Sequence, residues 1–156
     1  MSFMPTRKLN ILFVSEYFYQ RLAGGEVWSY ELCTALAKKG HKTTVLTTRY
    51  NPKLAEDEKI NNIHILRLHN NTINTTNRFS RYLSQRQFNK KVCRYIQEHK
   101  NDIDIIHTVA YSSNVPVSKT AKKLDIPCMT SIHAFFGKDW MLLSPLGKVI
   151  QRSFSS

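Results

Sequence analysis

The fold is decided by residues 11–48, which read ILFVSEYFYQRLAGGEVWSYELCTALAKKGHKTTVLTT. At the start of this stretch, residues 9–15 form a nearly continuous apolar run, which is typical of a strand buried on both faces of a parallel sheet. Apolar residues then recur at helical spacing as far as a lysine pair and Gly40, and cations followed by glycine predict a helix end. The β-branched residues of 43–48 predict a second strand, so the stretch predicts one strand–helix–strand unit.

The remaining sequence continues this alternation of strand and helix. We expect a third strand over 63–68, a long helix over 78–100 that bends or breaks, a fourth strand over 103–108, an amphipathic helix over 117–124, a fifth strand over 127–132 and a short helix over 146–152. A polar, charged connection begins at Asn51, and an Asn/Thr-rich loop covers 70–77. The alternation predicts a Rossmann-like α/β domain of three layers, with a mostly parallel sheet flanked by helices.

Length and composition are those of a single soluble domain over residues 1–156, with 42% hydrophobic and 22% charged residues. The apolar run near the start is too short for a signal-peptide core or a membrane span, so we expect a cytoplasmic protein. Cys33, Cys93 and Cys128 lack the spacing of a metal site and are interpreted as reduced packing residues.

The net charge of +12, from 23 Lys and Arg against 11 Asp and Glu, indicates an anionic partner. Nucleic acid, a lipid surface and a phosphorylated substrate all fit that charge. Nucleic acid is disfavoured because the sequence has no helix-turn-helix, RRM, KH or zinc pattern. A basic nucleic-acid-binding module and a Rossmann-like scaffold without catalysis stay open as alternative functions.

Much of the positive charge lies on the helix expected over 78–100, together with aromatic and aliphatic side chains such as Phe79, Tyr82 and Leu83. A basic helix with aromatic residues can lie on an anionic membrane, although a solvated helix face explains the same charges. The cations of this candidate membrane or anion surface are Arg78, Arg81, Arg86, Lys90, Lys91 and Arg94. We therefore expect peripheral association with the inner face of a membrane.

Candidate ligand-binding residues follow the expected strands, because ligands of open parallel sheets bind outside the carboxyl ends of the strands. Gly24 and Gly25 precede a helix whose unpaired first-turn amides can receive a phosphate, although a plain turn would also need glycine. Glu16, His107 and His133 end the first, fourth and fifth expected strands, where a structural role for each histidine is the alternative. The histidines have no Cys or carboxylate at ligand spacing, so we expect no metal site.

A family resemblance rests on residues 11–48 and 103–137. The first stretch resembles the opening of family-4 GT-B glycosyltransferases: a strand, a loop, Gly-Gly, a helix with a central E-L, then K-G-H and a second strand. The second stretch reads IDIIHTVAYSSNVPVSKTAKKLDIPCMTSIHAFFG and resembles that family's D-x-x-H strand end, its K-x-L-x-I-P and its next strand end at a histidine. The resemblance implies the acceptor-side half of a GT-B fold.

The resemblance also implies an activity. Such enzymes transfer a sugar, with retention of configuration, from a nucleotide-sugar to a glycan or lipid-linked acceptor, normally without a metal or other cofactor. Gly24 and Gly25 would contact the donor diphosphate or sugar, His133 would line the reaction centre as the catalytic residue, and His107 would shape the acceptor side. Glu16 is placed on the acceptor side by its position after the first strand.

The sequence departs from the family pattern at several points. Val109 stands where many members carry a second histidine, and Glu26 directly follows the glycine pair instead of standing one residue further on. The donor half of the family carries paired glutamates spaced E-x7-E, and no pair of glutamates here has that spacing. We therefore expect the C-terminal donor-binding domain to be absent from residues 1–156 and supplied in cis or in trans, so that this chain alone is inactive.

Overall fold

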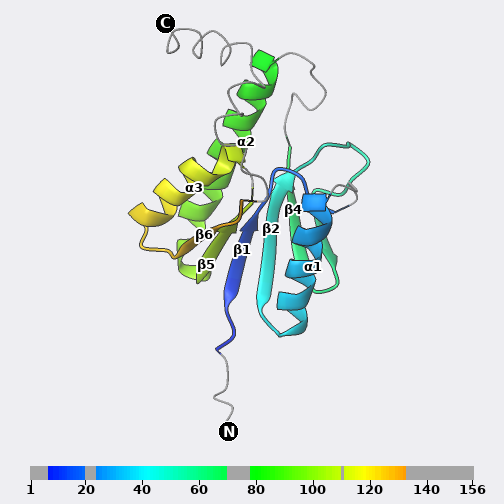
Figure 1. Ribbon diagram of the computed structural model, residues 1–156, viewed down its shortest axis with the longest axis vertical. Helices are drawn as coiled ribbons and strands as arrows, with labels where there is room; N and C mark the ends of the chain where they lie inside the picture. Colours follow the sequence, from blue (N-terminus) through cyan, green and yellow to red (C-terminus); the bar gives the residue numbers. More distant parts are fainter. Residues whose placement is uncertain (1–6, 20–23, 70–77, 110, 133–156) are drawn as a thin grey trace, which may run out of the picture.

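The computed structural model describes residues 7–19, 24–69, 78–109 and 111–132. The helix expected over 146–152 and the candidate residue His133 lie outside these ranges. The described elements alternate as expected (Figure 1). They are β1 (Asn10–Val14), α1 (Gly24–Lys38), β2 (Lys42–Thr48), β3 (Asp57–Ile60), β4 (Ile63–Leu68), α2 (Arg78–Glu98), the 3-10 turn η1 (Lys100–Asp102), β5 (Ile105–Thr108), α3 (Tyr111–Lys123) and β6 (Cys128–Thr130).

The strands form one sheet of six in the order β3-β4-β2-β1-β5-β6. Every neighbouring pair is parallel except β3 and β4, which pair antiparallel at the edge of the sheet. The mostly parallel sheet predicted from the sequence is therefore confirmed.

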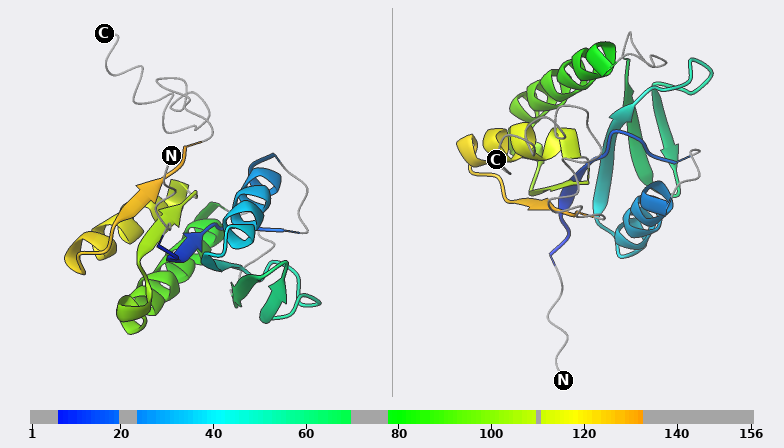
Figure 2. Two further views of the ribbon diagram at one scale, coloured as in Figure 1. Left: turned by 90° about the horizontal axis from the view of Figure 1, so that it is seen from below. Right: turned by 45° about the horizontal axis from the view of Figure 1, so that its top comes forward.

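Helices cover both faces of this sheet, α1 on one side and α2 with α3 on the other (Figure 2). On the α1 face, Phe13 and Val45 pack with Cys33 of the helix. On the opposite face, Leu12 and Leu46 belong to the cluster that also holds apolar residues of α2 and α3, among them Phe88, Val92, Ile96, Val117 and Ala121. Alternate residues of β1, β2 and β4 thus belong to two separate cores, one on each face of the sheet, and the predicted three-layer architecture is confirmed.

Strand β3 was not predicted, since residues 57–60 read DEKI and carry no apolar alternation. The strand is held at the sheet edge by an ion pair between Glu58 and Arg67 of β4, whose side chain is completely buried. The Arg67 guanidinium also donates to the carbonyl of Ala55 at 3.0 Å. A buried charged contact therefore replaces the apolar burial that sequence patterns detect.

The two later helices differ from expectation. Helix α2 runs from Arg78 to Glu98 as one continuous α-helix, so the expected bend or break is wrong. Helix α3 begins at Tyr111, before the predicted start at residue 117, although Pro116 lies inside it. Proline cannot donate to the carbonyl four residues earlier, which belongs to Ser112, and the Asn89 side chain donates to that carbonyl instead at 2.8 Å.

The cysteines form no disulfide, as expected for reduced thiols. Cys33 is buried, Cys93 is partly buried and Cys128 is exposed. Among the helices described, none has the length and apolar character needed to cross a membrane.

Candidate functional site

The carboxyl ends of the parallel strands meet at the upper edge of the sheet in Figure 1, which we call the carboxyl edge. Helix α1 begins at this edge, and the first turns of α2 project beyond it (Figure 1). Glu16 follows β1, Gly24 and Gly25 open α1, and His107 lies near the end of β5. The fold therefore brings these sequence-predicted residues to the same edge.

Gly24 and Gly25 are the first two residues of α1, whereas the sequence placed them just ahead of it. Neither has a positive φ, and a Cβ atom added to either would meet nothing within 4 Å. Neither backbone conformation nor packing among the described residues therefore requires glycine. The phosphate contact itself stays a prediction.

Glu16 is held from two helices. Its Oε2 accepts hydrogen bonds from Gln85 Nε2 of α2 and from Ser112 Oγ of α3, both at 3.4 Å. Its carbonyl accepts from the Thr48 amide of β2 at 3.1 Å. The half-buried carboxylate is thus oriented at the carboxyl edge and keeps lone pairs that can accept from a ligand hydroxyl. Sequence reasoning missed Gln85 and Ser112, which lie 69 and 96 residues from Glu16.

His107 is only 3% exposed and lies under α1 rather than in open solvent. Its Nε2 is 2.8 Å from Ser131 Oγ, and its ring makes an edge contact with Phe13 at a centroid distance of 4.9 Å. Trp28 of α1 contacts the same imidazole edge-on at 6.1 Å while remaining 37% exposed. His107 thus joins the end of β5 to the residue after β6 and supports Trp28, and its acceptor-side role stays a prediction.

Trp28 is the residue at this edge that sequence reasoning interpreted only as part of a helix pattern. It lies one turn after Gly24, beside Val27, which is also exposed. The short distance along the helix between the glycines and Trp28 was the signal that could have identified it.

The cations of α2 are exposed wherever the structure describes their side chains, and their role as a membrane or anion surface stays a prediction. Arg81, Arg86, Lys90, Lys91 and Arg94 are all exposed, while nothing is described of the Arg78 side chain. Lys91 Nζ donates to the carbonyl of His69 at 2.5 Å, and the Arg86 guanidinium lies 5.9 Å from the Tyr82 ring centroid.

Apolar side chains occupy the first turns of the same helix. Phe79, Tyr82 and Leu83 are exposed by 67%, 54% and 43%. They lie on the part of α2 that projects past the carboxyl edge (Figure 1), so the helix has an apolar tip followed by a cationic flank.

The thiols of Cys33 and Cys128 are poor nucleophiles. Burial raises the pKa of the Cys33 thiol well above its ordinary value. Burial also raises the pKa of Cys128, and a hydrogen bond with Ser118 opposes this shift in part. Both thiols therefore stay protonated at neutral pH. Within the described ranges, no group of three or more His, Cys, Asp or Glu could hold a metal ion.

Comparisons with known proteins agree with this geometry. The family model described as Glycosyltransferase Family 4 matches residues 22–156. No curated protein matches the sequence.

Solved structures are similar in fold. A sucrose-phosphate synthase from Thermosynechococcus elongatus is 15% identical with a TM-score of 0.67, and the match covers 88% of this chain and 36% of the synthase chain. A partial chain of that synthase is 16% identical with a TM-score of 0.61, covering 80% of this chain and 64% of the other. The C-terminal domain of the PF1911 hydrogenase from Pyrococcus furiosus is 16% identical with a TM-score of 0.56, covering 82% and 95%. At these identities the likeness concerns the fold alone, and the chain spans about a third of the whole synthase.

Proposed function

The chain belongs to Glycosyltransferase Family 4, and we propose that it is the acceptor-side half of a retaining enzyme of the hexosyltransferase type. It would act in the transfer of a sugar from a nucleotide-sugar to a glycan or lipid-linked acceptor. The observation that carries the proposal is the position of the glycine pair of α1 and the oriented Glu16 at the same carboxyl edge.

The glycine pair would act on the donor. The first amides of α1 have no partner within the helix, and the helix dipole adds partial positive charge at that end. Among the described residues, no atom lies within 4 Å of where a Cβ of Gly24 or Gly25 would stand, so a diphosphate could approach the backbone there. Charge grows on the diphosphate as the sugar departs, and fixed backbone donors stabilise such charge without reorganisation. This account calls for no metal ion or other cofactor.

Glu16 would act on the acceptor. The two side-chain donors that hold its carboxylate restrict its orientation, and an acceptor hydroxyl could donate to the remaining lone pairs. His133 is proposed to line the reaction centre beside the transferred sugar. His107 would then be a positioning residue, because its imidazole contacts Trp28 and Ser131 within the domain.

A second domain completes the proposal. The paired glutamates of the nucleotide-binding half are absent from the sequence, and the chain matches 36% of the synthase chain. We infer that a donor-binding domain, in cis or in trans, closes over the carboxyl edge. The exposed Val27 and Trp28 beside the glycine pair support this, since they offer apolar surface at that edge.

We also propose a cytoplasmic location with peripheral binding to the inner face of a membrane. The apolar tip of α2, Phe79, Tyr82 and Leu83, would enter the lipid interface while its cationic flank meets anionic head groups. Sedimentation with anionic and with neutral liposomes tests this. Salt-sensitive binding to anionic liposomes that Phe79→Ser weakens is expected, and equal recovery with both liposome types would contradict it.

Nucleic-acid binding is the second candidate, and the net charge of +12 is the observation that favours it. Filter binding across a salt series separates the two functions. Tight binding that falls steeply with salt would favour nucleic acid, and weak binding would favour the glycosyltransferase reading.

The proposed function is tested by binding to the isolated chain. Amide NMR signals of residues at the carboxyl edge should shift with an acceptor glycan or lipid-linked acceptor, while nucleotide-sugars should bind weakly or not at all. Strong nucleotide-sugar binding by this chain alone would contradict the assignment as the acceptor-side half.

A further inference from the structure

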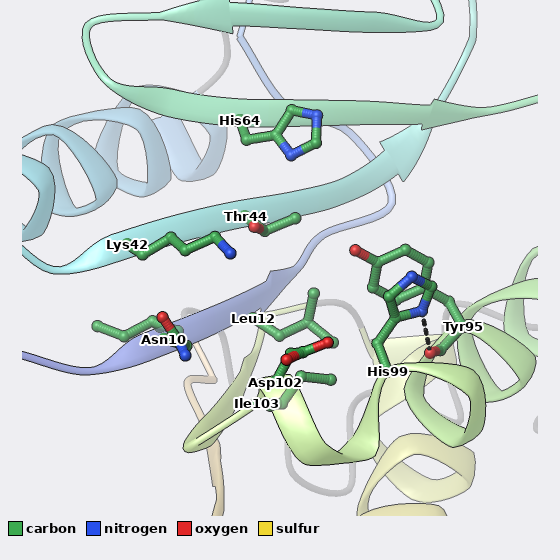
Figure 3. Close-up of a pocket in the computed structure, with 10 residues that line it drawn as sticks. Asn10, Leu12, Lys42, Thr44, His64, Tyr95, His99, Asp102 and Ile103 are labelled. Carbon is green, nitrogen blue, oxygen red and sulfur yellow. Dashed lines mark hydrogen bonds between the residues drawn. The ribbon is translucent and has the colours of Figure 1, made fainter.

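A pocket of about 180 Å³ opens at the opposite edge of the sheet, where the parallel strands begin. Its walls are the first residues of β1 and β2, His64 near the start of β4, the last turn of α2 and the turn η1 (Figure 3). We call it the amino-edge pocket. It lies on the α2 face of the sheet, at the far end of the strands from Glu16 and the glycine pair.

The topology explains why this end of the sheet is open. The chain passes from β2 to β4 through β3 and turns, so the connection between these two parallel strands contains no helix. Thr44 of β2 and His64 of β4 are register partners on this face. Two residues further along the strands, the register partners Leu46 and Leu66 lie on the same face and belong to the apolar core. Polar side chains therefore stand at the start of strands that become apolar where α2 covers them.

Several polar groups around the pocket have no protein partner among the described residues. They are the Lys42 ammonium and the Asp102 carboxylate, which are exposed, and the Thr44 hydroxyl and the Asn10 side-chain amide, which are partly buried. They come from different elements and surround a common space (Figure 3). The set mixes donors with acceptors and one cation with one anion.

The remaining polar groups are fixed in orientation. His99 Nδ1 donates to the Tyr95 carbonyl at 3.0 Å, and its ring stacks on Tyr95 at a centroid distance of 4.0 Å. His64 Nε2 lies 2.8 Å from Asp57 Oδ1. Burial, reinforced by the charges of Asp102 and Asp57, raises the pKa of Tyr95, so its hydroxyl keeps its proton and can donate. The pocket thus presents preset hydrogen-bonding groups beside an aromatic pair.

The volume of the pocket and its mixture of hydrogen-bond donors and acceptors indicate which kind of ligand would fit. The pocket has a volume of about 180 Å³ and is partly open to solvent, which gives room for one sugar ring. A phosphate would meet the Asp102 carboxylate opposite Lys42, whereas a neutral polyhydroxylated ring satisfies donors and acceptors together. We propose that the amino-edge pocket is a second, non-catalytic binding site for a single hexopyranose unit. This site goes beyond the proposed sugar transfer and does not depend on it.

The test is NMR titration of the whole chain with methyl glycosides of glucose, mannose and galactose, and separately with inorganic phosphate. At least one glycoside should give saturable shifts at the amides of Lys42, Thr44 and Asp102. Lys42→Met should weaken that affinity about tenfold, since one hydrogen bond from a charged group is lost, while Lys38→Met on the exposed end of α1 should not. Asp102→Asn is the second variant, and a dispersed amide spectrum shows that each variant folds.

Three results would overturn the site. They are saturable shifts from phosphate alone, shifts from glycosides confined to the carboxyl edge, and glycoside affinity that Lys42→Met and Asp102→Asn both leave unchanged. Binding of an acceptor at the carboxyl edge is read from different amides in the same spectra, so failure of this site is distinguishable from failure of the proposed function.

Discussion

The two edges of the sheet differ in how much of a binding site the described residues form there. At the carboxyl edge the chain presents a surface: helix amides opened by a glycine pair, an oriented Glu16 and exposed Val27 and Trp28. At the amino edge the described residues line a pocket that is partly open to solvent. The two proposals therefore assign half of a site to one edge of the domain and a whole site to the other.

The largest expected effect is on activity, and it comes from replacing a glycine at the carboxyl edge but not one at the amino edge. Gly25→Ala should lower kcat/KM of the complete enzyme about 100-fold, because a methyl group stands between the amides and the diphosphate. It should leave stability unchanged or raise it by up to about 1 kcal/mol, because its Cβ meets nothing. Steady-state kinetics and thermal unfolding of the same preparation measure both.

Gly40→Ala is the matched control at the amino edge. Gly40 has φ 84° and its added Cβ would lie 3.0 Å from Lys8 Nζ, so this variant should lose about 1–2 kcal/mol of stability and keep its kcat/KM. If the two alanine variants lost activity equally, the separate role of the carboxyl edge would be wrong.

The next effect concerns the buried ion pair that attaches β3. Arg67→Met should destabilise the chain by about 3 kcal/mol, because Glu58 keeps a charge in a mostly buried place without its partner. Arg7→Met removes the exposed pair with Asp104 and should cost less than about 1 kcal/mol. Urea unfolding of both variants gives the comparison, and equal costs would show that Arg67 does not secure β3.

A smaller loss of stability is expected from Asn89→Ala. Its side chain donates to the Ser112 carbonyl freed by Pro116 and accepts from Ser113 Oγ at 2.7 Å. Leaving these groups unsatisfied should lower the free energy of unfolding, measured by chemical denaturation, by about 2 kcal/mol. An unchanged midpoint would mean that water replaces the amide and that Pro116 is tolerated for another reason.

The smallest expected effect is on acceptor binding. Glu16→Gln should raise the KM for the acceptor about tenfold, since the charge that strengthens the hydroxyl contact is lost while the side chain keeps its shape. Glu31→Gln on α1, an exposed position, should leave that KM unchanged. A rise in the KM for the nucleotide-sugar instead would place Glu16 on the donor side.

Much of the fold could be predicted because buried parallel strands leave strong apolar runs. The expected strands at residues 9–15, 43–48, 63–68, 103–108 and 127–132 all overlap observed ones. Strand β3 could not be predicted, since its attachment depends on a contact between Glu58 and Arg67 rather than on apolar burial. The start of α3 at Tyr111 could not be predicted, because proline disfavours a helix around its own position in the sequence. The Asn89 side chain of α2 compensates by donating to the carbonyl that Pro116 leaves without a helical donor.

The candidate site was predictable in position and less so in detail. The strand ends and the glycine pair placed Glu16, Gly24 and His107 at one edge without knowledge of the structure. The donors to Glu16 and the contact of Trp28 with His107 depend on packing between elements far apart in sequence. The amino-edge pocket was equally hidden, because it exists only where the topology omits a helix.

The most direct test of the half-site at the carboxyl edge is sugar transfer by residues 1–156 combined with a donor-binding domain of the same family. We predict that neither part alone transfers sugar from a nucleotide-sugar, that the combination does, and that Gly25→Ala and His133→Ala each reduce the rate. Turnover by residues 1–156 alone, or an equal rate from the combination carrying both substitutions, would contradict the account.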